Sequence, residues 1–248
     1  MHEARLTLRQ AHTQLTHAQK GHARGAPAYS VYINRRIGRL LAASAYRLRF
    51  TPNAVTGVSA AHTFLGIVLL MLAPSSPWTG AAVALLLALG YAWDSADGQV
   101  ARLTGQGSPA GEWLDHFVDA IKIASLHIAV LVAAWFHTPM RDTWWLVVPL
   151  VFSVVATVTF FGMLLNDLIK AGHGGVSTHT RGGGTLGRSL LLLPTDFGIV
   201  CLVFLTWGWP SLFFWLYGAL AAASLGFLLL ASVKWFSEMR ALGVDKRS

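Results

Sequence analysis

Six apolar stretches, each about as long as a bilayer is thick, constrain this chain more than any other feature of its sequence. We place them at 53–73, 79–101, 112–136, 143–169, 189–208 and 210–236. A helix needs roughly 20 apolar residues to cross a ~30 Å hydrocarbon core. Only 12% of all residues are charged, whereas soluble domains carry about 25%. The sequence therefore predicts an all-α integral membrane protein with six transmembrane helices.

A basic amphipathic segment precedes the first apolar stretch. Over residues 28–50, apolar side chains recur at helical spacing, with arginines interleaved. Such a helix is suited to lie at the surface of an anionic leaflet. Thr51 followed by Pro52 predicts the N-cap and first position of the next helix. The predicted units are a polar extension (1–27), a juxtamembrane interfacial helix (28–50), a six-helix domain (51–236) and a tail (237–248).

The basic residues lie mainly at one end of this predicted bundle. They occur in the N-terminal region, after Arg102, in the 170–188 loop and in the tail, whereas the opposite loops carry only Arg141. The positive-inside rule then predicts that both termini face the cytoplasm, in the inner or plasma membrane. The formal charge of +8 is not arranged as an aromatic-interleaved patch, so we expect contact with anionic lipid and not with nucleic acid.

Acidic residues are concentrated in one short region. Five of the 11 fall between positions 94 and 119, namely Asp94, Asp97, Glu112, Asp115 and Asp119. The first two aspartates are three residues apart and the last two are four apart, so each pair lies on one helix face. A short loop joins the two predicted helices, which must therefore be antiparallel neighbours. Their inner faces can bring four carboxylates together just inside the membrane.

Four carboxylates at this depth require a positive partner. Oxygen ligands favour Mg²⁺, Mn²⁺ or Ca²⁺ over zinc, and Mg²⁺ commonly completes its shell with substrate phosphates. Gly98 follows Asp97 and permits close approach of a ligand to the backbone. Ala101 is also small, and Arg102 carries a guanidinium suited to a diphosphate. The region therefore predicts a site for a metal ion and a diphosphate.

The same residues resemble the motif of the CDP-alcohol phosphotransferase family, also called CDP-alcohol phosphatidyltransferases. The family pattern is D-x2-D-G-x2-A-R-x8-G-x3-D-x3-D, and every fixed position and spacing is met. The matching residues are Asp94, Asp97, Gly98, Ala101, Arg102, Gly111, Asp115 and Asp119. The six-helix layout with a preceding interfacial helix extends the resemblance to most of the chain.

The resemblance implies a role for each matching residue. The four aspartates would hold metal, with two Mg²⁺ or Mn²⁺ ions expected, and Asp119 would also act as general base on the acceptor hydroxyl. Gly98, Ala101, Arg102 and Gly111 would line the CDP pocket. Members of the family are commonly homodimers with the active site open to the cytoplasm.

The implied activity is Mg²⁺-dependent transfer of a phosphoalcohol group from a CDP-alcohol to a hydroxyl, with release of CMP. We expect CDP-diacylglycerol as donor and a polar acceptor such as inositol phosphate or glycerol phosphate, hence phospholipid biosynthesis. A soluble donor such as CDP-inositol, as in di-inositol-phosphate synthases, stays open. A cation transporter that uses the carboxylates as its ion site is the alternative from a different class, although the far halves of the segments offer few polar residues.

Several residues outside the motif are weaker candidates. Thr51 and Pro52 could contact the nucleotide as well as start a helix. Acceptor binding is expected from a set of charged residues near the same end of the bundle or within the fifth segment, namely Lys122, Arg181, Arg188 and Asp196.

Overall fold

The computed structural model describes residues 6–17, 26–174 and 185–244, and over these residues it contains helices and no strand. The α-helices are α1 (Leu8–His17), α2 (Arg35–Arg47), α3 (Pro52–Leu72), α4 (Pro77–Thr104), α5 (Pro109–His137), α6 (Val147–Gly172), α7 (Leu186–Leu191), α8 (Phe197–Val203) and α9 (Pro210–Val244). Shorter turns are the π-helical η1 (Ser30–Asn34) and the 3-10 turns η2 (Pro139–Asp142), η3 (Trp144–Leu146), η5 (Leu193–Thr195) and η6 (Phe204–Thr206). The all-α prediction is confirmed.

Five helices in the described chain are long and apolar enough to cross a membrane. They are α3, α4, α5, α9 and the helix formed by η3 together with α6. Their outer faces expose large apolar side chains such as Leu72, Phe136 and Leu230. A bilayer can accept such faces because each helix satisfies its backbone hydrogen bonds internally. The chain is therefore an integral membrane protein.

The stretch 189–208, predicted as one span, is instead divided into short helices. The helix α7 ends at Leu191, and η5, α8 and η6 follow in turn. Pro194 lacks a backbone N–H and disfavours helical geometry in the residue before it. Asp196 then starts α8 afresh, because its side chain accepts a hydrogen bond from the Gly198 backbone N–H at 3.0 Å. Six continuous spans are therefore not confirmed.

Three of the long helices begin in the same way. A hydroxyl residue stands at the N-cap and a proline at the first helical position of α3, α4 and α5. The caps are Thr51, Ser76 and Ser108, and each side-chain oxygen accepts a hydrogen bond from a backbone N–H of the first turn. Such caps satisfy N–H groups that have no partner within the helix. The predicted start at Thr51 and Pro52 is confirmed.

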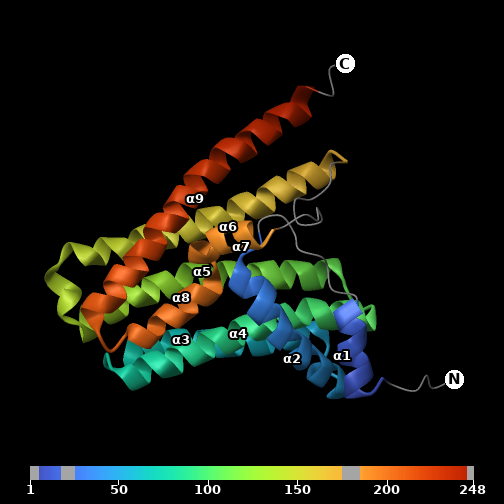
Figure 1. Ribbon diagram of the computed structural model, residues 1–248, viewed down its shortest axis with the longest axis horizontal. Coiled ribbons are helices and arrows are strands. Elements are labelled where there is room, and N and C mark those ends of the chain that lie inside the picture. The colour runs from blue at the N-terminus through green and yellow to red at the C-terminus, as the bar shows by residue number, and fades with distance from the viewer. Residues whose placement is uncertain (1–5, 18–25, 175–184, 245–248) are drawn as a thin grey trace.

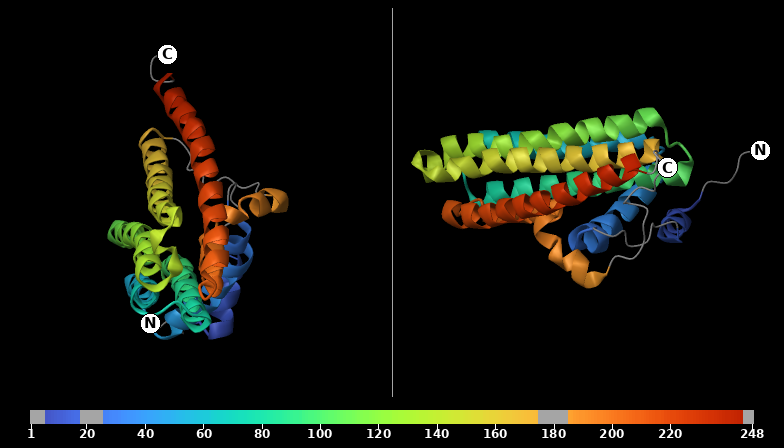
Figure 2. Two further views of the ribbon diagram at one scale, coloured as in Figure 1. Left: turned by 90° about the vertical axis from the view of Figure 1, so that its left-hand side faces the viewer. Right: turned by 90° about the horizontal axis from the view of Figure 1, so that it is seen from above.

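The helices α4 and α5 each pack on α3, α6 packs on α5, and α9 packs on α6. The short helices α1 and α2 lie at one end of this bundle, beside the connection between α4 and α5 (Figures 1 and 2). At the opposite end the core is aromatic. Its largest fully buried side chains are Trp207, Tyr217, Phe204, Phe213 and Phe214. The two ends of the bundle therefore differ in chemistry.

The predicted juxtamembrane segment is helical, as η1 and α2. Its apolar side chains Ile33, Ile37 and Leu40 are exposed in the described chain, while its small residues Ala42 and Ala45 are buried. The segment therefore docks on the bundle through a small-residue face. The long helix α9 continues to Val244, beyond position 237 where the tail was expected to begin.

One close contact between α3 and α4 lies next to the acidic region. A Cβ atom added to Gly90 would lie 2.2 Å from the Thr63 hydroxyl and 3.2 Å from the Ser59 carbonyl oxygen. The Ser59 hydroxyl donates to the Gly90 carbonyl at 2.9 Å. Small residues allow helices in membranes to approach closely and to form such interhelical hydrogen bonds.

We predict that Gly90→Val lowers the unfolding temperature of the purified protein by several degrees, because the larger side chain separates α3 from α4. Overpacking of this kind typically costs about 1–3 kcal/mol. Gly57→Ala is the matched control on α3, since a Cβ atom there meets nothing within 4 Å. Thermal unfolding in detergent measures both variants. Equal unfolding temperatures for Gly90→Val and the wild type would contradict the contact.

Candidate active site

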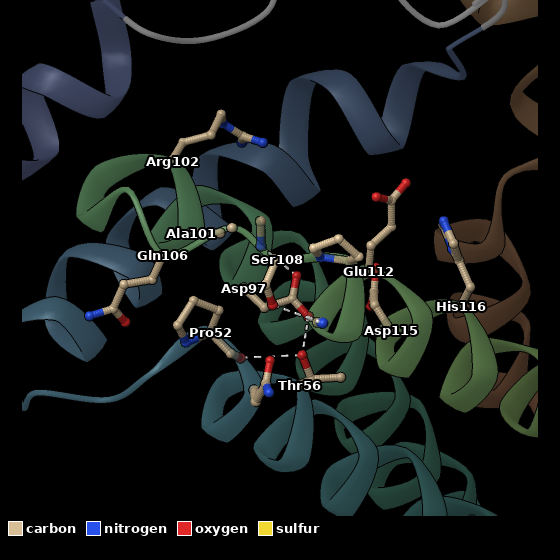
Figure 3. Close-up of a pocket in the computed structure, with 15 residues that line it drawn as sticks. Pro52, Thr56, Asp97, Ala101, Arg102, Gln106, Ser108, Glu112, Asp115 and His116 are labelled. Atoms are coloured by element: carbon tan, nitrogen blue, oxygen red, sulfur yellow. Dashed lines mark hydrogen bonds between the residues drawn. The ribbon is translucent and has the colours of Figure 1, made fainter. Parts of the chain in front are cut away.

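The site lies where α4 ends and α5 begins. Gly105 closes α4 with a left-handed backbone, φ 68°, and Ser108 caps α5 three residues later. This tight reversal makes the two helices antiparallel, as the sequence predicted. Figure 3 shows Asp97 on α4 and Asp115 on α5 reaching toward the same region. The two aspartate pairs are therefore presented from consecutive helices that both pack on α3.

A pocket of about 640 Å³ opens beside these carboxylates. Its walls come from the start of α3, the end of α4 and the start of α5 (Figure 3). The lining residues are Pro52, Asn53, Thr56, Asp97, Gly98, Ala101, Arg102, Gln106, Gly107, Ser108, Pro109, Gly111, Glu112, Asp115 and His116. Two motif carboxylates, the motif arginine and the motif glycines thus share one cavity.

Asp97 is held in a defined orientation. Its side chain is buried, with 6% of the residue exposed. The Thr56 hydroxyl donates to Asp97 Oδ2 at 2.8 Å, and the Gly98 backbone N–H donates to Oδ1 at 2.5 Å. Hydrogen-bonded carboxylates of this kind are pre-oriented for ligation. Thr56 therefore supports the metal-binding candidate from α3.

Asp94 and Asp119 form the second half of the acidic cluster. The Lys122 ammonium lies between them, with Nζ 2.6 Å from Asp94 Oδ1 and 3.1 Å from Asp119 Oδ1. Ser59 on α3 accepts a third hydrogen bond from Nζ at 3.0 Å. Lys122, predicted as an acceptor-binding residue, is thus engaged with carboxylates of the motif.

The cluster fits a hard divalent cation. Asp115 Oδ1 is buried and has no hydrogen-bond partner among the described residues, so it is an oxygen ligand without a donor. One atom each from Asp115, His116 and Asp119 lie within 4.8 Å of one another, a grouping that could hold a metal ion. Carboxylate oxygens of this kind suit Mg²⁺ or Mn²⁺. His116, whose buried Nδ1 also lacks a described partner, joins the set from its position next to Asp115.

Most of the residues predicted to bind the CDP group lie at the pocket. Pro52, Gly98, Ala101, Arg102 and Gly111 line the pocket. Thr51 caps α3 and is absent from this lining.

Asp196 is almost fully buried at the start of α8, with 1% of the residue exposed. Its two carboxylate oxygens accept backbone N–H bonds from Ser30 and Gly198. It is not part of the described pocket lining, so its expected contact with the acceptor stays a prediction. Arg181 and the side chain of Arg188 lie outside the described residues.

Two supporting residues were not identified from the sequence. Thr56 and Ser59 on α3 bind Asp97, Asp94 and Lys122. A signal was present, because Asn53, Thr56, Ser59 and Thr63 recur at helical spacing in an otherwise apolar segment. A polar stripe on a membrane helix faces protein or a cavity and not lipid.

Comparison with known proteins places the chain in a family. The model for the CDP-alcohol phosphatidyltransferase family matches residues 49–233. This range includes the whole acidic cluster and most of the described helices. The chain therefore belongs to the CDP-alcohol phosphatidyltransferase family, and the resemblance drawn from the motif is confirmed.

Two relatives of the chain are named as enzymes with different activities. Phosphatidylinositol phosphate synthase of Corynebacterium glutamicum is 32% identical over 157 residues, which cover 62% of this chain and 64% of that protein. Choline/ethanolaminephosphotransferase 2 of Arabidopsis thaliana is 40% identical over 91 residues, which cover 36% of this chain and 21% of that protein. The chain thus spans less than two thirds of the length of these curated relatives.

Solved structures share the fold. The crystal structure of Mycobacterium tuberculosis phosphatidylinositol phosphate synthase with CDP-DAG bound aligns with a TM-score of 0.53 at 23% identity, over 80% of this chain and 90% of that one. The same enzyme in complex with manganese and citrate aligns with a TM-score of 0.52 at 21% identity, over 82% and 89%. At this level of identity the likeness concerns the fold.

We predict that Thr56→Val weakens Mn²⁺ binding about tenfold, because Asp97 loses the hydroxyl that orients it; removing such supporting hydrogen bonds typically costs 10–100-fold in metal affinity. Isothermal titration of the purified protein measures the affinity. Thr159→Val is the matched control, since the Thr159 hydroxyl donates to the Val155 carbonyl of its own helix. Identical Mn²⁺ affinities for Thr56→Val and Thr159→Val would contradict the role given to Thr56.

Proposed function

We propose that this protein is a Mg²⁺- or Mn²⁺-dependent CDP-alcohol phosphotransferase that releases CMP and contributes to phospholipid biosynthesis. One observation carries the proposal. The motif residues Asp97, Asp115 and Arg102 line a single pocket, directly beside the Asp94–Asp119 pair. Carboxylates for a divalent ion and a guanidinium for phosphate are the groups that a diphosphate substrate requires. Family membership over residues 49–233 supports the same activity.

The proposed reaction is a displacement at phosphorus. The acceptor hydroxyl oxygen forms a bond to the phosphorus that bears the donor alcohol, and the bond from that phosphorus to the CMP oxygen breaks with its electron pair. Asp119 takes the proton of the acceptor hydroxyl. Arg102 binds the diphosphate, and the small residues Gly98 and Ala101 leave room for the nucleotide. When bound, divalent ions would neutralise the diphosphate and the charge that develops on CMP.

We propose CDP-diacylglycerol as the donor and a polar alcohol such as inositol phosphate or glycerol phosphate as the acceptor. The longer match, to a phosphatidylinositol phosphate synthase, supports this choice. A second candidate keeps the chemistry but uses a soluble donor such as CDP-inositol or a CDP-amino alcohol. The shorter match at 40% identity, to a choline/ethanolaminephosphotransferase, favours that candidate.

A cation transporter is less well supported. Transport needs polar groups along a path across the membrane. In the described chain the end opposite the carboxylates is filled by buried aromatic residues, including Trp207, Phe204 and Phe213. The buried polar side chains beyond the carboxylates, such as His127 and Thr138, are hydrogen-bonded within the protein.

We further propose an arrangement in the membrane. The broken segment from α7 to η6 would complete a sixth crossing beside α4 and α9, against which α8 packs. The segment 28–50 would lie at the interface, with the exposed Ile33 and Leu40 toward lipid. Both termini and the pocket would face the cytoplasm, with the chain divided into the four units predicted from the sequence. The protein would form a homodimer, and each subunit would bind two metal ions.

We predict that Asp119→Asn lowers CMP release at least 100-fold while the protein still folds, because the amide cannot accept the proton; general bases typically contribute 10²–10⁴-fold. Purified protein is assayed with Mg²⁺, CDP-diacylglycerol and either inositol phosphate or glycerol phosphate. CDP-inositol and CDP-choline test the second candidate. Asp142→Asn is the matched control, since that carboxylate is largely exposed in the far connection.

Release that needs acceptor, metal and Asp119 supports the enzyme and identifies its substrates. Turnover only with a soluble CDP-alcohol would contradict CDP-diacylglycerol as the donor and support the second candidate. No CMP from any of these donors, with a folded protein and bound metal, contradicts the proposed function.

A further inference from the structure

An ammonium group is built into the carboxylate cluster. Lys122 is 6% exposed, and its Nζ lies within 3.1 Å of three acceptors: Asp94 Oδ1, Ser59 Oγ and Asp119 Oδ1. A lysine ammonium has three N–H donors, so this geometry uses all of them. The acceptors come from α3, α4 and α5, the three helices that build the site.

The position of Lys122 divides the cluster into two parts. Asp94 and Asp119 share the ammonium, whereas Asp97 and Asp115 line the pocket. Four ionised carboxylates would carry a formal charge of about −4, and the ammonium reduces it to about −3. Opposite charges a few ångströms apart interact strongly away from bulk water. Removal of one partner of a buried ion pair leaves the other uncompensated.

We propose that Lys122 is a positioning residue that acts as a permanent internal cation. It links Asp94 on α4 to Asp119 on α5 and keeps the cluster stable without metal. Because it repels divalent ions, it also weakens their binding. The inference rests on the proposed function only in taking the carboxylates as a divalent-ion site.

This role has a signature that a purely structural lysine lacks. Loss of the positive charge makes the cluster more negative, so divalent ions bind more tightly. The same loss leaves Asp119 without the donor that orients it, so turnover falls. Metal affinity and turnover therefore change in opposite directions, whereas a general loss of packing would lower both.

The test uses Lys122→Met, which keeps the length of the side chain, and Lys122→Gln, which keeps hydrogen-bonding capacity without charge. Mn²⁺ affinity is measured by titration of the purified full-length protein, and unfolding temperature is measured in EDTA and in Mn²⁺. Lys122→Arg retains the charge. Lys170→Met is the matched control, because Lys170 pairs with Glu238 at 2.6 Å between α6 and α9.

We expect both uncharged variants to bind Mn²⁺ at least tenfold more tightly than the wild type. We expect Lys122→Met, which has no donor for Asp119, to release CMP at least tenfold more slowly. Their unfolding temperature falls in EDTA and is largely restored by Mn²⁺. Lys122→Arg stays within about threefold of the wild-type Mn²⁺ affinity, because Coulomb repulsion depends on the charge it retains. Lys170→Met keeps wild-type Mn²⁺ affinity and loses the same stability in EDTA as in Mn²⁺.

Unchanged or weaker Mn²⁺ binding by the uncharged variants overturns the proposal. Failure of both variants to fold even when purified in Mn²⁺ also overturns it, because the bound ion should replace the missing charge. These readouts do not depend on activity. A wild-type protein that binds Mn²⁺ but turns over no CDP-alcohol would refute the proposed function and leave the role of Lys122 to be decided by binding alone.

Discussion

Negative charge buried between α4 and α5 requires positive charge and hydrogen-bond donors nearby, and the local structure follows from that requirement. Ionised carboxylates are costly near hydrocarbon, yet Asp94, Asp97, Asp115 and Asp119 converge at one end of the bundle. Lys122 compensates one pair. Thr56 and Gly98 donate to Asp97. Asp115 Oδ1 has no described donor, and this is where the need for a divalent ion is most direct.

Local features of the sequence position the helices around the carboxylate cluster. A capping threonine or serine with a following proline fixes the starts of α3, α4 and α5. Gly105 permits the sharp reversal that makes α5 antiparallel to α4. Close packing at Gly90 brings the polar stripe of α3 against α4. The aromatic core lies at the other end of the bundle, where Trp207 contacts the connection between α3 and α4. The carboxylate cluster and the aromatic core thus lie at different ends of the membrane-spanning helices. The polar site therefore does not interrupt the packing of the core.

Much of the site could be predicted from sequence because it is local. Two aspartate pairs with helical spacing on either side of a short loop lie at the same end of two antiparallel helices. The helix start at Thr51 was equally readable from its cap and the proline that follows. The partners of the carboxylates were harder, because Thr56, Ser59 and Lys122 meet them only through tertiary packing. The segment 189–208 was predicted as one continuous helix because its high mean hydropathy outweighed the break that Pro194 and Asp196 impose.

The central claim is that these carboxylates hold a divalent ion against the diphosphate of a CDP-alcohol. A crystal grown with Mn²⁺ and CDP-diacylglycerol, with the metal located by anomalous scattering, tests it most directly. The account predicts a manganese peak in coordinating contact with Asp97 and Asp115 and with the diphosphate, and the Arg102 guanidinium on the same phosphates. Manganese bound elsewhere, or a nucleotide outside the pocket between α3, α4 and α5, would contradict it.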